Sequence, residues 1–315
     1  MHSITAVYGP ISRLVMSTNA GTLIALSVGI LVLSACTGEV DSDPPTPVSH
    51  TPSVRIALAS TDLSLGLNRV AFGLMDVAEG PVRDAEVQLS SFFLNGDVNE
   101  GPIETTTAVW RQWPLGDTGI YTTNLSFDRV GRWGILTRIE TSNGVQSATA
   151  SLDVKEQSFT PMIGSVPPMS TTKLAADYDD LKEITSDLQA DPELYAITVR
   201  QGLEAGIPLV VIFSTPSYCR TATCGPQLEI IKILKTEYAK RVNFVHVELY
   251  ENPSQLEGDL SNAVLANSVI EWALPSEHWT FVMDSDGATS AKFEGFVTRA
   301  ELDSELLRVL KHVES

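Results

Sequence analysis

The chain has 315 residues, of which 21 are lysine or arginine and 39 are aspartate or glutamate, so its formal net charge is −18. This acidic balance argues against nucleic acid as a partner, because binding to a phosphate backbone depends on basic side chains. Three cysteines are too few for a small domain held together mainly by disulfides.

The N-terminal segment contains an apolar run of twelve residues, 22–33, "TLIALSVGILVL". It is too short to span a bilayer comfortably and has the length of a signal-peptide core. It ends in Leu33-Ser34-Ala35-Cys36, which resembles the lipobox of bacterial lipoproteins. The resemblance implies cleavage of residues 1–35 and a lipid on Cys36. We therefore expect an exported protein, lipid-anchored to a bacterial membrane on its extracytoplasmic side; an uncleaved short anchor is the alternative.

Lipidation of Cys36 would leave Cys219 and Cys224 as the remaining pair. Extracytoplasmic compartments permit disulfides, so we expect these two cysteines to be joined.

Residues 36–52 are rich in proline and acid, which predicts an extended tether. Residues 53–156 contain about seven short runs of β-branched and aromatic residues separated by turns, the pattern of a β-sandwich. Alternation is clear at Val70, Phe72 and Leu74. The stretch from Asp117 to Tyr121 resembles the tyrosine corner of immunoglobulin-like sandwiches. This domain has no Cys or His, and no catalytic constellation is visible in it.

A second linker is predicted at 157–190, and residues 191–315 then alternate between helix and strand patterns. The expected elements are helices at 192–206, 225–241 and 261–273, strands at 208–213, 242–249, 279–284 and 288–296, and a last helix opened by a capping box at Thr298 and Glu301.

This order of elements resembles the thioredoxin fold over roughly 193–312, and within it the exported, membrane-anchored TlpA-related proteins. Family members carry Cys-x-x-Cys between the first core strand and its helix, where this chain has "FSTPSYCRTATCGP". The predicted fold class is therefore two-domain: an all-β immunoglobulin-like sandwich followed by an α/β thioredoxin-like fold.

The cysteine position suits thiol chemistry, because the N-terminus of a helix stabilises a thiolate. A thiolate attacks a substrate disulfide, and a second cysteine resolves the mixed disulfide. The spacing here is Cys-x4-Cys, longer than in the family. Counting forward from Phe213 favours Cys219 as the nucleophile. Alternatively, "CGPQ" resembles the family's Cys-Gly-Pro-Cys with Gln227 in place of the second cysteine, which favours Cys224. Both assignments stay open.

Two positions depart from the family pattern. Ile212 stands where many thioredoxins have a buried acid that handles protons. His278 stands where the family has a cis-proline, and Pro275 lies three residues too early to replace it. A non-proline residue does not readily hold a cis peptide.

The alignment places His278 close to Cys219 and Cys224. Two cysteines and a histidine in this setting resemble the site of Sco-type copper proteins, and thiolate and imidazole suit copper chemically. The same histidine could raise thiolate character through an ion pair, or could be an ordinary loop histidine. His246 is expected to be structural, and neither His50 nor His312 has a ligand-like neighbour.

Three functions follow from these patterns. The preferred one is thiol–disulfide exchange with exported proteins that carry thiols or disulfides, through Cys219 and Cys224 and without a cofactor. The second is a Sco-type copper chaperone that uses Cys219, Cys224 and His278. The third is a non-catalytic interaction lipoprotein in which the disulfide is a structural staple.

Overall fold

The structure is a computed structural model that describes residues 53–96, 98–114, 116–141 and 144–313. The predicted signal peptide at 1–35, the predicted tether at 36–52 and the predicted lipid site at Cys36 lie outside these residues. Among the helices in the described ranges, none is long and apolar enough to cross a membrane.

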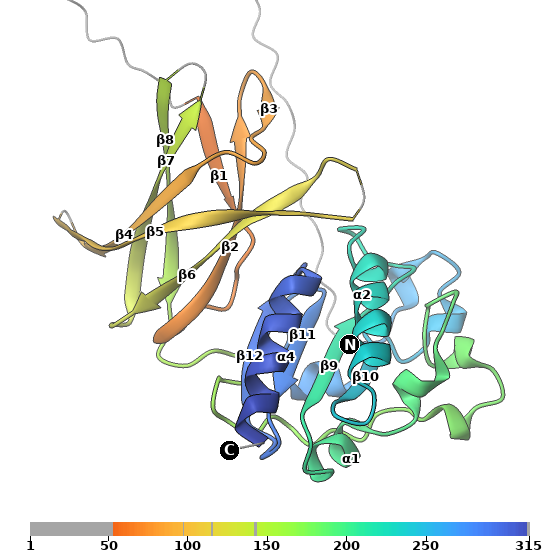
Figure 1. The fold of residues 1–315 in the computed structure, drawn as a ribbon. Coiled ribbons are helices and arrows are strands. Elements are labelled where there is room, and N and C mark those ends of the chain that lie inside the picture. Colours follow the sequence, from red (N-terminus) through yellow and green to blue (C-terminus); the bar gives the residue numbers. More distant parts are fainter. Residues whose placement is uncertain (1–52, 97, 115, 142–143, 314–315) are drawn as a thin grey trace, which may run out of the picture. The chain divides into compact units, whose positions relative to one another are not determined.

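Eight strands form the first sheet, in the order β1-β2-β6-β5-β4-β7-β8, with β3 paired to β2 (Figure 1). All pairs are antiparallel, and β1 also contacts β8, so the sheet is nearly closed on itself. The strands are β1 (Val54–Leu58), β2 (Gly66–Asp76), β3 (Gly80–Pro81), β4 (Val87–Asn95), β5 (Val98–Gln112), β6 (Gly119–Phe127), β7 (Gly131–Thr141) and β8 (Gly144–Val154).

Alternate side chains fill the core of this sheet. Val70, Phe72 and Leu74 on β2 are buried, which confirms the predicted alternation. Tyr121 on β6 is also buried, but its hydroxyl accepts a hydrogen bond from the backbone N–H of Ala85 at 2.9 Å. Ala85 lies 36 residues upstream, so the predicted local tyrosine corner is wrong; the bond ties β6 to the segment before β4.

A second sheet has four strands in the order β10-β9-β11-β12. β10 runs parallel to β9, whereas β11 runs antiparallel to β9 and to β12. Its strands are β9 (Leu209–Ser214), β10 (Asn243–Glu248), β11 (Trp279–Met283) and β12 (Thr289–Glu294). The α-helices within the described residues are α1 (Val199–Glu204), α2 (Cys224–Glu237), α3 (Asn267–Glu271) and α4 (Arg299–Val313). Single turns of 3₁₀ helix occur at Ala175–Asp177, Leu181–Glu183, Pro192–Tyr195, Pro253–Gln255 and Leu260–Asn262.

Strand β9 is buried along its whole length. Val210 and Ile212 join an apolar cluster with buried residues of α2 and α4, whereas Val211 and Phe213 join a second cluster with Trp272 and β11. Because successive side chains of a strand point to opposite faces, a strand covered on both faces needs a continuous apolar run. The sequence "PLVVIF" supplies that run.

The predicted fold class, an immunoglobulin-like sandwich followed by an α/β thioredoxin-like fold, is wrong. Strands hold 39% of the described residues and helices 21%, so this part of the chain is mostly β. The first part is one nearly closed sheet instead of two packed sheets, because β5 pairs with both β6 and β4 and so joins all the strands. The second part is a small sheet with mostly short helices and is not a clear α/β thioredoxin fold.

Local hydrogen bonds explain why one predicted helix is short. The segment predicted as helix 192–206 starts with a 3₁₀ turn at Pro192–Tyr195. The α-helix begins only after Thr198, whose side chain forms a capping box with Gln201. Such reciprocal bonds satisfy the free N–H groups that define a helix start. The new start leaves α1 only six residues long.

Pairing across the chain shortens another predicted helix. Within 261–273, Leu265 forms a backbone bridge with Tyr250, which requires an extended conformation, and α3 covers only five residues. The two longest predicted helices are confirmed as α2 and α4. The capping box that opens α4 is present, since the N–H of Glu301 donates to the Thr298 hydroxyl at 3.2 Å and the N–H of Thr298 donates to the Glu301 carboxylate at 3.0 Å.

Truncation of a buried residue on α4 tests this packing. Leu306 is fully buried, so Leu306→Ala should lower the free energy of unfolding by about 2–5 kcal/mol, because it removes apolar contacts and leaves a cavity. Leu307, the next residue on the same helix, is 45% exposed. Leu307→Ala is the matched control and should change the free energy of unfolding much less in denaturant titrations. Equal losses for both variants would contradict the packing of α4.

Candidate functional site

The two cysteines lie between β9 and α2. Ser214 ends the strand, and a loop over residues 215–223 leads to Cys224, the first residue of the helix. Cys219, within this loop, forms a disulfide with Cys224, and their Cα atoms are 5.9 Å apart. The buried strand and the 14-residue helix hold the two ends of the loop, so the disulfide lies where a rigid strand meets a rigid helix.

The two sulfur atoms have different surroundings. Cys224 is fully buried, whereas Cys219 is partly exposed. The Sγ of Cys219 accepts a hydrogen bond from the backbone N–H of Cys224 at 3.3 Å, and it lies 3.3 Å from the hydroxyl of Thr221. The first N–H groups of a helix have no partner within the helix and mark the positive end of its dipole. A thiolate on Cys219 would therefore be stabilised there.

Arg220, next to the accessible cysteine, is held by Glu277. Its backbone N–H donates to the Glu277 carboxylate at 3.1 Å, and the side chains are 3.9 Å apart. The Arg220 side chain is 82% exposed, so this ion pair is weak. The contact connects the cysteine loop to the segment just before His278.

His278 is fully buried beside the disulfide. Its Nδ1 lies 3.5 Å from the Sγ of Cys224. A disulfide sulfur can only accept a hydrogen bond, so Nδ1 is the donor in this contact. Burial lowers the pKa of His278 to about 4, and the nearby backbone of Gly295 opposes that shift. Among the described residues, Nε2 has no partner with hydrogen-bond geometry.

The structure brings the three predicted site residues together. The donor atoms of Cys219, Cys224 and His278 all lie within 4.8 Å of one another. This cluster depends on the loop after β9 and the residue before β11, which are adjacent because those strands pair. By contrast, Ile212, where the family pattern would have an acid, is buried in the apolar cluster with α2 and α4.

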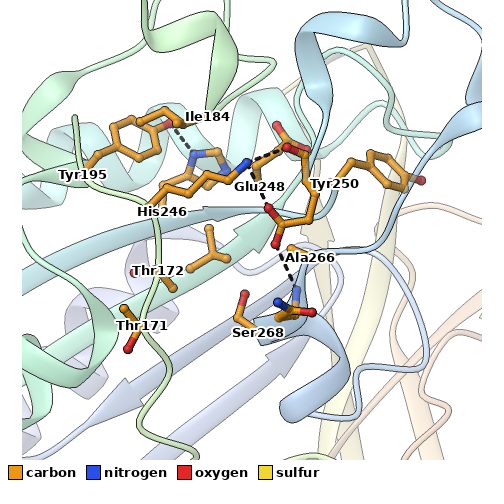
Figure 2. Close-up of a pocket in the computed structure, with 13 residues that line it drawn as sticks. Thr171, Thr172, Ile184, Tyr195, His246, Glu248, Tyr250, Ala266 and Ser268 are labelled. Carbon is orange, nitrogen blue, oxygen red and sulfur yellow. Dashed lines mark hydrogen bonds and ion pairs between the residues drawn. The ribbon is translucent and has the colours of Figure 1, made fainter. Parts of the chain in front are cut away.

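His246 is a structural residue, as predicted. It is buried on β10, and its Nδ1 lies 2.6 Å from the hydroxyl of Tyr195. Its Nε2 lies 3.2 Å from the backbone carbonyl of Ser214, which only accepts, so Nε2 carries the proton and Nδ1 accepts from Tyr195. Burial lowers the pKa of His246 to about 4. Figure 2 shows the Tyr195 hydroxyl directed at this ring. Neither of these two bonds involves a residue of the cysteine loop.

The pocket in Figure 2 contains a residue whose importance the sequence did not reveal, Glu248. Burial raises its pKa, and hydrogen bonds from Thr215, Ser186 and Leu249 oppose that shift. The pocket holds about 70 Å³, far less than the several hundred Å³ of a typical small-molecule site. The pocket is therefore too small for a typical small molecule, and the notable feature of Glu248 is its set of buried hydrogen bonds. The only sequence signal was a carboxylate at the end of an apolar strand.

The predicted lipid site Cys36 and the histidine His50 lie outside the described parts of the chain. The side chain of His312 is not described either. The lipid site at Cys36 therefore stays a prediction.

No family model matches the chain, and no curated protein matches it. Solved structures of disulfide-exchange proteins are similar to part of it. A putative thiol:disulfide interchange protein DsbE from Chlorobium tepidum is 14% identical over 48% of this chain and 99% of its own, with a TM-score of 0.35. A thioredoxin family thiol:disulfide interchange protein from Chlorobium tepidum TLS is 14% identical over 42% of this chain and 99% of its own, with a TM-score of 0.29. A conjugative transposon lipoprotein from Bacteroides eggerthii is 11% identical over 32% of this chain and 96% of its own, with a TM-score of 0.18.

The lowered pKa of His278 predicts a loss of stability in acid. Because the pKa in the folded state is about 4 and the ordinary value is 6.5, protons bind the unfolded chain more tightly. The contribution of His278 to the free energy of unfolding is complete above pH 6.5. It falls by up to about 3 kcal/mol as the pH approaches 4. His278→Asn, which cannot titrate, should flatten the curve of unfolding free energy against pH in this window. Parallel curves for the two proteins would contradict a buried neutral imidazole.

Proposed function

We propose that the chain exchanges thiols and disulfides with exported proteins through Cys219 and Cys224. The observation that supports this most is the asymmetry of the pair: one sulfur is accessible at a helix N-terminus, and the other is buried against His278. An exchange site needs one sulfur that a partner can reach and a second that only its neighbour can reach.

The reaction follows from this asymmetry. In the reduced protein the Cys219 thiolate attacks one sulfur of a partner disulfide, and the other partner sulfur leaves as a thiolate. Cys224 then passes its proton to the partner thiolate released in the first step and attacks Cys219, which forms the Cys219–Cys224 disulfide and releases the second partner thiolate. Two electrons pass to the partner, and the reverse sequence oxidises a partner dithiol. The Nδ1–H of His278 would stabilise negative charge on Cys224 at either stage.

We propose further that the protein acts outside the cytoplasm, anchored to a bacterial membrane by a lipid on Cys36. The lipobox-like sequence and the disulfide support this location, because disulfides persist in oxidising compartments. A lipid anchor would leave the cysteine loop free to meet exported proteins.

A trapping experiment tests the exchange reaction and the order of attack. Cys224→Ser leaves the accessible thiol without its resolving partner, so mixed disulfides with exported proteins should accumulate on nonreducing gels. Cys219→Ser is the matched control and should trap far less, because its remaining thiol is buried. Absence of adducts with both variants, together with a wild-type reduction potential far below about −300 mV, would identify a structural staple instead.

A second candidate is a copper site at the same three residues. It is favoured by the mutual distances of at most 4.8 Å between the two sulfurs and a ring nitrogen. Two thiolates and an imidazole suit Cu(I). Because the sulfurs are joined in the disulfide, Cys219 and Cys224 could hold the ion only after reduction, with His278 completing the set.

Removal of the imidazole tests this candidate. On the reduced protein, His278→Ala should weaken Cu(I) binding by about tenfold or more, because one of three ligands is lost. The affinity can be measured by competition with a coloured Cu(I) chelator, with Cys219→Ser as the variant that must also lose affinity. Unchanged affinity in His278→Ala would count against a site that includes the histidine.

A further inference from the structure

Glu248 is a buried carboxylate at the end of β10, the strand next to the one that leads into the cysteine loop. It is the last residue of β10 and pairs with Ser214, the last residue of β9, in the parallel ladder. Only 5% of Glu248 is exposed. A carboxylate in such a position requires strong partners, because burying an unpaired charge is costly.

Hydrogen bonds supply those partners. One carboxylate oxygen of Glu248 accepts from the backbone N–H of Ser186 at 2.8 Å and from the Ser186 hydroxyl at 2.7 Å. The other oxygen accepts from the backbone N–H of Leu249 at 3.0 Å. All three groups donate, and an ionised carboxylate can only accept, so the arrangement fits the charged form.

Ser186 in turn holds the cysteine loop. Its hydroxyl accepts from the backbone N–H of Ser217 at 3.2 Å and lies 3.4 Å from the hydroxyl of Thr215. The Ser217 hydroxyl also donates to the backbone carbonyl of Ser186. Ser217 is two residues before Cys219. A continuous series of hydrogen bonds therefore runs from Glu248 through Ser186 to the loop that carries the accessible sulfur.

We propose that Glu248 is a positioning residue that favours the disulfide over the dithiol by anchoring the cysteine loop. The proposal rests on the proposed exchange function of Cys219 and Cys224. When the disulfide is reduced, an anchored loop keeps the two thiols close, and proximity favours re-formation of the bond. Without the anchor Cys219 can move away, and the dithiol gains freedom that the disulfide lacks.

The test is a thiol–disulfide equilibrium of the full chain in glutathione buffers. Glu248→Gln keeps the size of the side chain but replaces one carboxylate oxygen with an NH₂ donor, so the amide cannot accept from both Ser186 and Leu249. It also removes the negative charge, so the bonds that remain are weaker. We expect the equilibrium constant to shift about tenfold toward the dithiol, which is ~30 mV for a two-electron couple. The fraction reduced is read by alkylation of free thiols and mass spectrometry.

Glu251→Gln is the matched control. Glu251 lines the same pocket, but its carboxylate bonds with Lys173 and with the backbone N–H of Asn267. The thiol–disulfide equilibrium constant of Glu251→Gln should match that of the wild type. Ser217→Ala changes an exposed residue and removes a second bond between the loop and Ser186, from the Ser217 hydroxyl to the Ser186 carbonyl. It should therefore shift the equilibrium in the same direction as Glu248→Gln, by less. It is also the variant that tests the anchoring of the loop if Glu248→Gln does not fold.

The outcomes separate this proposal from the exchange function. The positioning role would be overturned if both Glu248→Gln and Ser217→Ala had the wild-type equilibrium constant. If Glu248→Gln does not fold, a wild-type constant in Ser217→Ala would overturn it. The reason is that a residue that only supports the fold stabilises both redox states equally. Trapped mixed disulfides could still be found in that case. Conversely, a shifted equilibrium without any trapped partner would support the positioning role and contradict the exchange function.

Discussion

The arrangement of the second sheet depends on β9, a strand buried on both faces. It pairs with β10 on one side and with β11 on the other, and its alternate side chains enter two separate apolar clusters. Every residue of the candidate site is attached to it or to its neighbours: the cysteine loop follows β9, His278 precedes β11 and Glu248 ends β10. Because close packing on both faces prevents β9 from shifting, the cysteine loop, His278 and Glu248 are held at fixed distances from one another.

The chemistry of the site arises from unequal burial across one covalent bond. The start of α2 holds Cys224 in the interior, while the loop leaves Cys219 partly open to solvent. The sulfur that a partner can reach is also the one that accepts the first helical N–H. Accessibility and thiolate stabilisation therefore coincide at Cys219, and the neutral His278 ring faces the sulfur that stays inside.

Much of the local structure could be predicted from the sequence, but the fold class could not. Apolar runs and capping signals identified the strands of the second sheet, α2 and α4, and the element order placed His278 beside the cysteines. The helical pattern at 261–273 failed because Leu265 pairs with Tyr250, a contact that periodicity does not encode. Glu248 was missed for a similar reason, since its partner Ser186 lies 62 residues away in the chain.

The buried polar groups at the end of β9 have a further consequence for strand register. Where both faces of a strand are apolar, a slip by one residue exposes no hydrophobic side chain, so polarity cannot select the alignment. The bonds from His246 to Ser214 and from Glu248 to Ser186 supply that selection, because a slip would leave their buried polar atoms unpaired. Glu248, which is connected to the cysteine loop through Ser186, thus also helps to specify which residues of β9 and β10 lie side by side.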